Sequence, residues 1–227
     1  MKKEIYIYHH LGMGDHIVAN GMVRTIAKEY DKVYVFCKPR YIKNVTFMYR
    51  DLSKIKIIAL DDIDVRIFIK FNPNNNYLIA GHAPFMKIYN SPQNTLQLDE
   101  IFYQLAGVPF ENKWKEFYLK RDMEREKELF NSYKINEPFI FVHDDDKRKI
   151  TKELPSIKII HSIPEISIFD YLYIIENAQE VHVINSSFFV LIDCMNLRQE
   201  GIFMHRYAYV NELPPTGKFI NPWKIIN

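Results

Sequence analysis

The chain has 227 residues, of which 48% are hydrophobic, and its 30 basic and 28 acidic residues give a formal net charge of +2. This length fits one large domain or two small ones of about 110 residues each. The hydrophobic content excludes wholesale disorder, and the even charge balance gives no argument for nucleic acid or an anionic membrane as a partner.

The N-terminal stretch "MKKEIYIYHH" lacks the long apolar segment of a signal peptide. No window approaches the roughly 18 uninterrupted apolar residues that a membrane span requires. We therefore expect a cytoplasmic protein without an integral membrane segment. Cys37 and Cys194 each lie in an apolar stretch, which predicts two buried thiols and no disulfide framework.

Strand and helix signals alternate along the first third of the chain. Residues 61–71, "DDIDVRIFIKF", begin with acids, as a helix N-terminus prefers, although their β-branched content leaves a strand open. Strands are predicted at 4–10, 32–37, 54–60 and 77–82, and helices at 15–30 and 39–51. This spacing is typical of βαβ units with a parallel sheet.

Residues 96–135 are mostly helical in pattern and predict a connector. The stretch "TLQLDEIFYQLAGVPF" reads as a helix that ends at Gly107 and Pro109, and "MEREKELFNSY" reads as a charged, exposed helix.

A second alternating run follows the connector. Strands are predicted around 138–143, 157–162, 180–185 and 201–205, with helices at 168–178 and 186–196. The predicted fold class is therefore α/β with two Rossmann-like halves, 1–95 and 136–227, joined by the helical connector 96–135.

The stretch "GMGD" follows the first strand and opens a helix. A dinucleotide fingerprint would need a third glycine where Ile17 stands and an acid after the second strand, where "FCKPR" is basic. Asp15 would repel a phosphate at this helix end but is suited to accept a proton from a hydroxyl. The alternative is that Asp15 only caps the helix.

The stretch "LGMGDHIVANGMVRTIAKEY" resembles the N-terminal motif of GT-B glycosyltransferases of the heptosyltransferase type. In that family a strand leads into a Gly-Asp turn, and the aspartate is the proposed base that deprotonates the acceptor hydroxyl. Carried onto this sequence, the base is Asp15, and Gly12 and Gly14 shape the turn. Asn20 stands near the place where the family usually has a proline.

The resemblance implies two halves that face each other across a cleft, an acceptor-side N-terminal half and a nucleotide-sugar-binding C-terminal half. It implies inverting, metal-independent transfer of a sugar to an acceptor hydroxyl, in surface polysaccharide or glycan synthesis. We expect His10, His16 and Asn20 to contact substrate beside Gly12 and Gly14. No cofactor is expected beyond the nucleotide-diphosphate sugar, which is the donor substrate.

A second candidate site is "EVHVINSSFF", residues 180–189. Asn185 ends a strand, and Ser186 and Ser187 offer hydroxyls and free N–H groups at the start of a helix. In the resembled family, such a turn holds the nucleotide pyrophosphate. Capping alone is the alternative. His182, earlier in this strand, is placed in the same predicted nucleotide site, although a polar strand position would also explain it.

A third candidate site is "FVHDDDKRKI", residues 141–150. His143 ends a buried strand, and Arg148 and Lys149 can clamp a diphosphate. Asp144 and Asp146 also spell the Asp-x-Asp motif with which GT-A enzymes hold a divalent metal. A solvated loop with neutralising charges is the third reading. We expect no required metal, because this motif opens a second βαβ run.

The predicted function is glycosyl transfer from a nucleotide-sugar to a carbohydrate acceptor. Two alternatives stay open: a non-catalytic nucleotide- or sugar-binding protein of the same fold, and a metal-dependent GT-A-like transferase that uses Asp144 and Asp146. The sequence predicts neither the sugar nor the oligomeric state.

Overall fold

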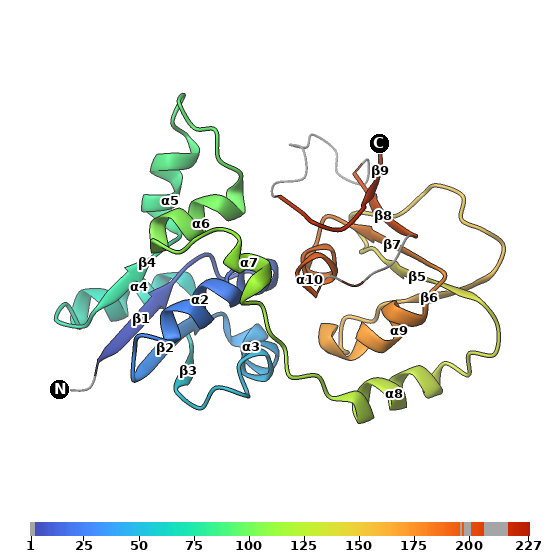
Figure 1. The fold of residues 1–227 in the computed structure, drawn as a ribbon, viewed down its shortest axis with the longest axis horizontal. Helices are drawn as coiled ribbons and strands as arrows, with labels where there is room; N and C mark the ends of the chain where they lie inside the picture. The colour runs from blue at the N-terminus through green and yellow to red at the C-terminus, as the bar shows by residue number, and fades with distance from the viewer. Residues whose placement is uncertain (1–2, 196, 198–200, 207–217) are drawn as a thin grey trace. The chain divides into compact units, whose positions relative to one another are not determined.

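The computed structural model describes residues 3–195, 197, 201–206 and 218–227. The chain divides into two compact units, with the boundary between Lys120 and Arg121; Lys218 belongs to the first unit and residues 219–227 belong to the second (Figure 1). This boundary falls inside the predicted connector 96–135. The helices α6 (Leu98–Ala106) and α7 (Asn112–Lys115) belong to the first unit, and α8 (Met123–Ser132) belongs to the second.

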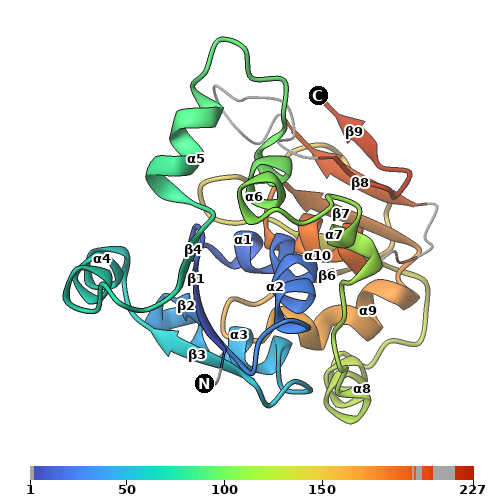
Figure 2. The ribbon, with the colours of Figure 1, turned by 60° about the vertical axis from the view of Figure 1, so that its left-hand side comes forward.

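The described part of the first unit contains a four-stranded parallel sheet in the order β3-β2-β1-β4 (Figure 2). Its strands are β1 (Glu4–Tyr8), β2 (Lys32–Cys37), β3 (Ile55–Ala59) and β4 (Tyr77–Ile79). The parallel pairing confirms the βαβ prediction. The first strand ends at Tyr8, two residues before the predicted end.

One face of this sheet is aromatic. Tyr6 stacks on Tyr34 with ring centroids 4.4 Å apart, and Phe36 contacts Phe68 of helix α4 (Asp62–Phe71) at 5.4 Å. Val65 of the same helix is fully buried in this cluster. Residues 61–71 therefore form a helix, because burial of Val65 and Phe68 against the aromatic face outweighs the strand propensity of the β-branched residues.

The predicted helix 15–30 is two helices, α1 (Met13–Val18) and α2 (Asn20–Ala27). A Cβ on Gly21 would lie 1.9 Å from the Asn112 carbonyl oxygen, so glycine is required for α7 to approach α2. Predicted helix 39–51 is a 3-10 turn, η1 (Pro39–Tyr41), followed by α3 (Ile42–Met48). Helix α5 (His82–Tyr89) had no sequence prediction. Helix α6 ends at Gly107 with φ 64, which confirms the predicted stop.

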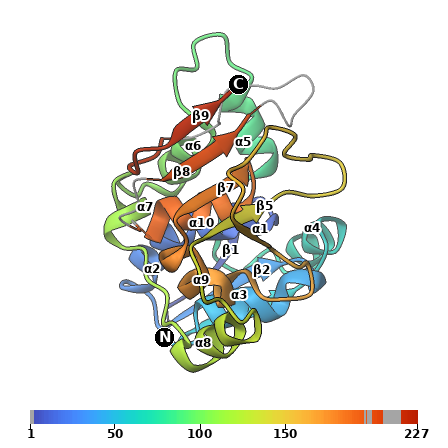
Figure 3. The same cartoon turned by 90° about the vertical axis from the view of Figure 1, so that its right-hand side faces the viewer.

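The second unit contains a five-stranded parallel sheet among its described residues, in the order β6-β5-β7-β8-β9 (Figure 3). Its strands are β5 (Phe139–His143), β6 (Lys158–His161), β7 (Glu180–Ile184), β8 (Ile202–His205) and β9 (Lys224–Ile226). The 3-10 turn η2 (Ile168–Tyr171) and helices α9 (Leu172–Asn177) and α10 (Ser187–Met195) join α8 in this unit. Strand β9 was not predicted. The other four strands confirm a second Rossmann-like half.

Cys37 and Cys194 are both buried free thiols, as predicted. Within the described ranges, no helix is long and apolar enough to cross a membrane.

Candidate functional site

The four strands of the first unit place polar side chains at their carboxyl ends. Lys38 follows β2, Asp62 follows β3, and His82 follows β4. Oδ1 of Asp62 lies 3.3 Å from the Tyr8 hydroxyl and 3.4 Å from Nε2 of His82, and its Oδ2 lies 3.2 Å from Nζ of Lys38. Burial raises the pKa of Asp62, but Lys38, His82 and Tyr8 outweigh that effect and hold the pKa below its usual value.

Asp15 lies in the first turn of α1, three residues after the N-cap. The N-cap is Gly12, in extended conformation with φ −74 and ψ 153, and its N–H donates to Oδ2 of Asp15 at 3.2 Å. Asp15 is therefore the acidic partner of a capping-box bond and not the N-cap itself. Gly14 lies within α1, so the predicted Gly-x-Gly turn is one extended glycine followed by a helical one.

A Cβ on Gly12 would lie 2.6 Å from Oδ2 of Asp15. Glycine at this position therefore leaves room for the carboxylate. The dihedral angles of Gly12 are open to any residue, so the requirement is for space and not for backbone freedom.

Burial raises the pKa of Asp15 to about 6, although the hydrogen bond from Gly12 and the positive charge of Lys38 lower it; the negative charge of Asp62 adds to the rise. A carboxyl group with this pKa is mostly ionised at neutral pH and is a stronger base than an ordinary aspartate. Such a group is suited to take a proton from a hydroxyl.

A cavity of about 650 Å³ lies at the carboxyl ends of β1 and β4, and Tyr8, His10, Arg66 and His82 line its polar part. The apolar remainder is Ile69, Ile79, Ala83, Pro84 and Met86. Burial lowers the pKa of His10 to about 4, and the neighbouring His82 adds to this. His10 is therefore a neutral ring at pH 7 and can act there as a hydrogen-bond donor or acceptor.

His16 is fully buried, and its ring lies edge-on to the ring of His9 with centroids 4.6 Å apart. Neither ring nitrogen of His16 has a hydrogen-bond partner among the described residues, and Nε2 of His9 has none either. Burial lowers the pKa of His16 well below its usual value. The predicted substrate contact of His16 thus falls on a side chain without exposed surface.

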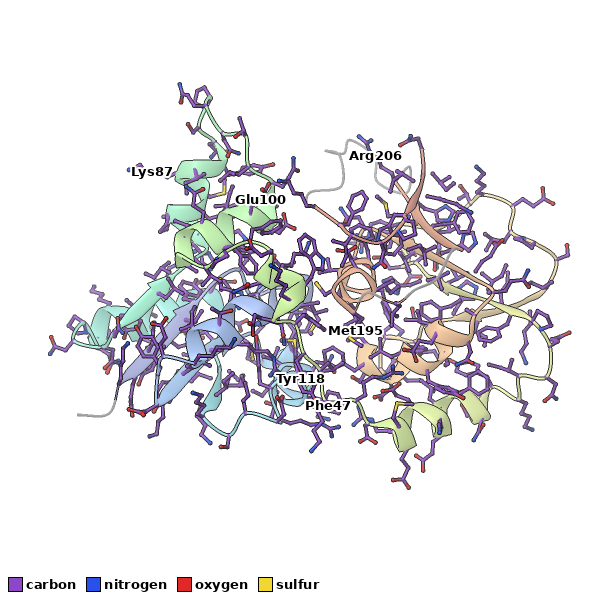
Figure 4. The ribbon with its side chains drawn as sticks, in the orientation of Figure 1. Phe47, Lys87, Glu100, Tyr118, Met195 and Arg206 are labelled. Atoms are coloured by element: carbon purple, nitrogen blue, oxygen red, sulfur yellow. The ribbon has the colours of Figure 1, made fainter. Side chains whose placement is uncertain are left out.

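Asn20 is also fully buried. Its Oδ1 accepts from Nε of Arg24 and from the backbone N–H of Tyr118, each at 3.1 Å (Figure 4 labels Tyr118). The bond from Arg24 lies within α2, and the bond from Tyr118 connects α2 to the segment after α7. They give Asn20 a structural use that the sequence pattern did not reveal.

The second unit places its polar cluster at the carboxyl ends of β5 and β7. Arg148 donates from Nε to Oδ2 of Asp145 at 2.8 Å and from Nη1 to the Asn185 carbonyl oxygen at 3.1 Å. Nδ1 of His143 lies 2.7 Å from Oγ of Ser162, and the His143 ring lies 4.3 Å from that of Phe188. The structure thus brings together His143, Arg148 and Asn185, which the sequence placed in one nucleotide site.

Ser186 accepts at Oγ from the N–H of Phe188 at 3.2 Å, as an N-cap side chain does, and Ser187 is the first residue of α10. Both serines are partly exposed. The Ser186 hydroxyl therefore acts as a helix cap, which is the alternative given by the sequence. The start of the helix still presents backbone N–H groups beside Arg148 and Asn185.

Lys149 lies with its Nζ 3.9 Å from Oδ1 of Asp144 and 3.5 Å from Oδ1 of Asp146. Asp144 also accepts from the Ile150 N–H at 3.0 Å. No group of three or more His, Cys, Asp or Glu side chains in the described part of the chain is arranged to hold a metal ion. The Lys149 ammonium thus lies within ion-pair distance of both carboxylates of the Asp-x-Asp stretch.

His182 lies in the middle of β7 and is nearly fully buried. Its Nε2 lies 2.9 Å from Oε2 of Glu180, its Nδ1 lies 2.8 Å from Nε2 of His205, and its ring stacks on Phe203 at 4.5 Å. It is two residues away from the strand end where Asn185 follows. These contacts agree with the alternative in which His182 is only a polar residue of the strand.

Sequence reasoning missed Lys38 and Asp62, which follow predicted strands, and His82, which is the last residue of the strand predicted at 77–82. The rule that ligand sites lie beyond the carboxyl ends of parallel strands could have found all three. His82 has a second signal in the structure, a φ of 55 in a residue other than glycine.

No protein-family profile matches the chain, and no curated protein matches it. Solved structures do match. A glycosyl transferase family 9 structure from Veillonella parvula aligns with TM-score 0.64 and 9% identity, over 99% of this chain and 86% of that one. ADP-heptose LPS heptosyltransferase II from E. coli aligns with TM-score 0.57 and 9% identity, over 98% and 90%. The iron-containing dodecameric glycosyltransferase TibC from enterotoxigenic E. coli aligns with TM-score 0.60 and 9% identity, over 100% and 62%.

The two parallel sheets, each covered by helices, define an α/β protein with two Rossmann-like units. At the level of fold, the chain is similar to these glycosyltransferase structures over nearly its whole length, and its architecture is the heptosyltransferase-type GT-B fold. The resemblance first carried by "LGMGDHIVANGMVRTIAKEY" is thereby confirmed as a likeness of fold.

Proposed function

We propose that this protein is a glycosyltransferase that moves a sugar from a nucleotide-diphosphate sugar to a hydroxyl of a carbohydrate acceptor. The observation that carries the proposal is the placement of Asp15, beside a glycine that leaves room for its carboxylate, with its pKa raised to about 6. Asp15 accepts the proton of the acceptor hydroxyl while the hydroxyl oxygen attacks the anomeric carbon. A single displacement of this kind inverts that carbon.

The polar cluster of the second unit supports donor binding. The Arg148 guanidinium is held in place by Asp145 and the Asn185 carbonyl, and the N-terminus of α10 begins at Ser187. Both features suit a diphosphate, which leaves with added negative charge as the glycosidic bond to the donor breaks. Lys149 and Ser186 lie in the same loops and add a cation and a hydroxyl. His143 borders the cluster as a neutral ring, because burial and the charge of Arg148 lower its pKa to about 4.

The metal-dependent alternative is less well supported by the residues themselves. Asp144 and Asp146 share the Lys149 ammonium, and Asp144 also accepts a backbone N–H. A non-catalytic binding protein would need Asp15 only for its capping-box bond to Gly12, and that bond does not require a raised pKa.

The test is product formation with a panel of UDP-, GDP-, ADP-, CMP- and dTDP-sugars and oligosaccharide acceptors, with the release of nucleotide as readout. We expect transfer by the native protein, without dependence on added Mg²⁺, and loss of at least about 100-fold in Asp15→Asn. The matched control is Asp31→Asn, an exposed aspartate in the same unit. Transfer that survives in Asp15→Asn would remove Asp15 as the base, and transfer only with Mg²⁺ would favour the Asp144 and Asp146 alternative.

A further inference from the structure

Helix α4 has a second apolar side that no described part of the chain covers. Ile63, Ile67 and Phe71 recur every four residues, so they lie along one side of the helix. Their exposed fractions are 71%, 48% and 76%. The opposite side, with Val65 and Phe68, packs on the aromatic face of the first sheet. Figure 2 shows α4 nearly end-on at the periphery of this unit.

This exposure is unusual for a helix of a soluble domain. A helix that covers a sheet normally has one apolar stripe, toward the core, and charged residues on its outer side. Single exposed apolar side chains need no explanation, but three in a row on one helix mark a surface that another molecule covers.

The charged residues beside the apolar stripe of Ile63, Ile67 and Phe71 indicate which kind of molecule can cover it. Ile67 is the midpoint of residues 63–71: Ile63 and Phe71 lie four residues to either side of it, and Asp64 and Lys70 lie three residues to either side. Asp64 and Lys70 are both exposed, and neither side chain has a hydrogen bond or ion pair among the described residues. The two charges are opposite in sign and flank the stripe on opposite edges, because they lie three residues before and after its midpoint.

We propose that α4 is the contact of a homodimer, in which two copies of the helix pack antiparallel about a two-fold axis at Ile67. Such an axis brings Ile67 against Ile67 of the second copy and Ile63 against Phe71 of the second copy. The same operation places each Asp64 beside the Lys70 of the other copy, so two ion pairs flank the apolar contact. A two-fold interface has to be self-complementary, and this helix satisfies that requirement in both shape and charge.

A membrane surface fits the stripe less well. Asp61, the N-cap of α4, and Asp64 are exposed, as are Arg66 and Lys70, so the charge around the stripe is mixed and not basic. An amphipathic helix that binds anionic lipid carries lysine and arginine on its polar face.

The helix also borders two of the cavities of the first unit. Ile63 lines a cavity of about 620 Å³ with Lys38 and Asp62, and Arg66 lines the cavity that contains His10. A second copy on α4 therefore lies at the rim of these two cavities. The dimer goes beyond the proposed function, because it stands on α4 alone and its test needs no activity.

The test is sedimentation equilibrium of the whole chain between about 1 μM and 1 mM, since a single helix pair buries less than the roughly 1,200 Å² of a standard interface and is expected to be weak. We expect concentration-dependent dimers. Ile67→Asp should leave only monomer. Asp64→Lys and Lys70→Asp should each weaken the dimer by about tenfold or more, since each places like charges together twice.

The double variant Asp64→Lys/Lys70→Asp restores both ion pairs with the signs exchanged, so it should dimerise within about threefold of the native chain. Lys43→Asp, at an exposed position on α3, is the control that should change nothing. Because all these side chains are exposed, circular dichroism should show the native fold in each variant. A monomer at every concentration would overturn the proposal. A dimer unaffected by Ile67→Asp, or a double variant no better than the single ones, would also overturn it. Cosedimentation of the monomer with phosphatidylglycerol vesicles, lost in Ile67→Asp, would replace the dimer with a lipid surface.

Discussion

The amide nitrogen of Gly12 lies 3.2 Å from Oδ2 of Asp15, and a side chain on that glycine would meet the same oxygen at 2.6 Å. One residue thus both holds the carboxylate and leaves space for it. The bond and the charge of Lys38 moderate the effect of burial, so that the pKa of Asp15 stands at about 6. This combination lets a half-buried acid stay ionised at neutral pH and still act as a base.

Gly12→Ala should therefore impair transfer although position 12 tolerates any residue in its backbone angles. The added methyl group displaces the Asp15 carboxylate, and a small displacement of a reacting group costs up to about 100-fold in rate. The measurement is kcat for donor turnover, with thermal unfolding as the control for folding. A Gly12→Ala protein with native kcat would mean that the carboxylate does not need this position.

Asp15→Asn should make the protein more stable at neutral pH. The pKa of Asp15 is raised above the value of an unfolded aspartate, so the folded state holds its proton more tightly and stability falls as pH rises from about 4 to about 6. Asparagine carries no charge and avoids that loss. We expect a Tm about 2–5 °C higher than that of the native protein at pH 7.5.

The same difference in Tm should shrink toward zero at pH 4, where Asp15 is protonated in the folded state and the penalty is absent. Thermal unfolding of both proteins at the two pH values checks this. An Asn variant that is less stable at pH 7.5 would contradict a buried, desolvated carboxyl at position 15.

Arg148→Ala should weaken binding of the nucleotide-diphosphate donor by about tenfold or more, because charge-assisted bonds to a phosphate contribute about 1.5–3 kcal/mol. Arg148→Lys should recover part of this, since lysine keeps the charge but loses the bidentate geometry. The readout is the donor Kd by calorimetry. Arg125→Ala is the matched control, because Arg125 pairs with Asp170 in the same unit. Equal losses in both variants would point to damage of the unit and not to donor contact.

Asn20→Ala should lower the free energy of unfolding by about 1–3 kcal/mol, because Arg24 Nε and the Tyr118 N–H lose a buried acceptor. The KM for the acceptor distinguishes the structural role of Asn20 from its predicted contact with the substrate. An unchanged KM, measured at a temperature where the variant is folded, would leave only the structural use. A raised KM with unchanged stability would favour the substrate contact.

Much of the fold could be predicted because strand and helix periods alternate cleanly in both halves. The predicted strands at 32–37 and 180–185 differ from β2 and β7 by one residue at most. The sequence left residues 61–71 ambiguous between helix and strand, because their β-branched residues favour a strand. Packing against the aromatic face of the sheet makes this segment a helix. Helix α5 was missed because it begins at His82 with a positive φ, which a sequence pattern does not reveal.

The places of three candidate site residues relative to the strands could be predicted from the sequence: Asp15 comes after β1, His143 ends β5 and Ser186 comes after β7. The partners of these residues were not predictable. Asp62 contacts Lys38 and His82 only because the fold brings three strand ends together. Asn20 has a structural role only because the fold places the backbone of Tyr118 beside α2. Contacts between distant parts of the chain depend on the tertiary structure and leave no local signal.

The most direct test of Asp15 as the catalytic base is the pH dependence of kcat between pH 4.5 and 9 for the native protein and Asp15→Asn, with saturating donor and acceptor. For the native protein we predict a kcat that rises with pH through an apparent pKa of about 6 and is level above about pH 7, because only the ionised carboxylate accepts a proton. For Asp15→Asn we predict a residual kcat without that rise. A native-like profile in the Asn variant, with the same rise near pH 6, would contradict the assignment of Asp15 as the base.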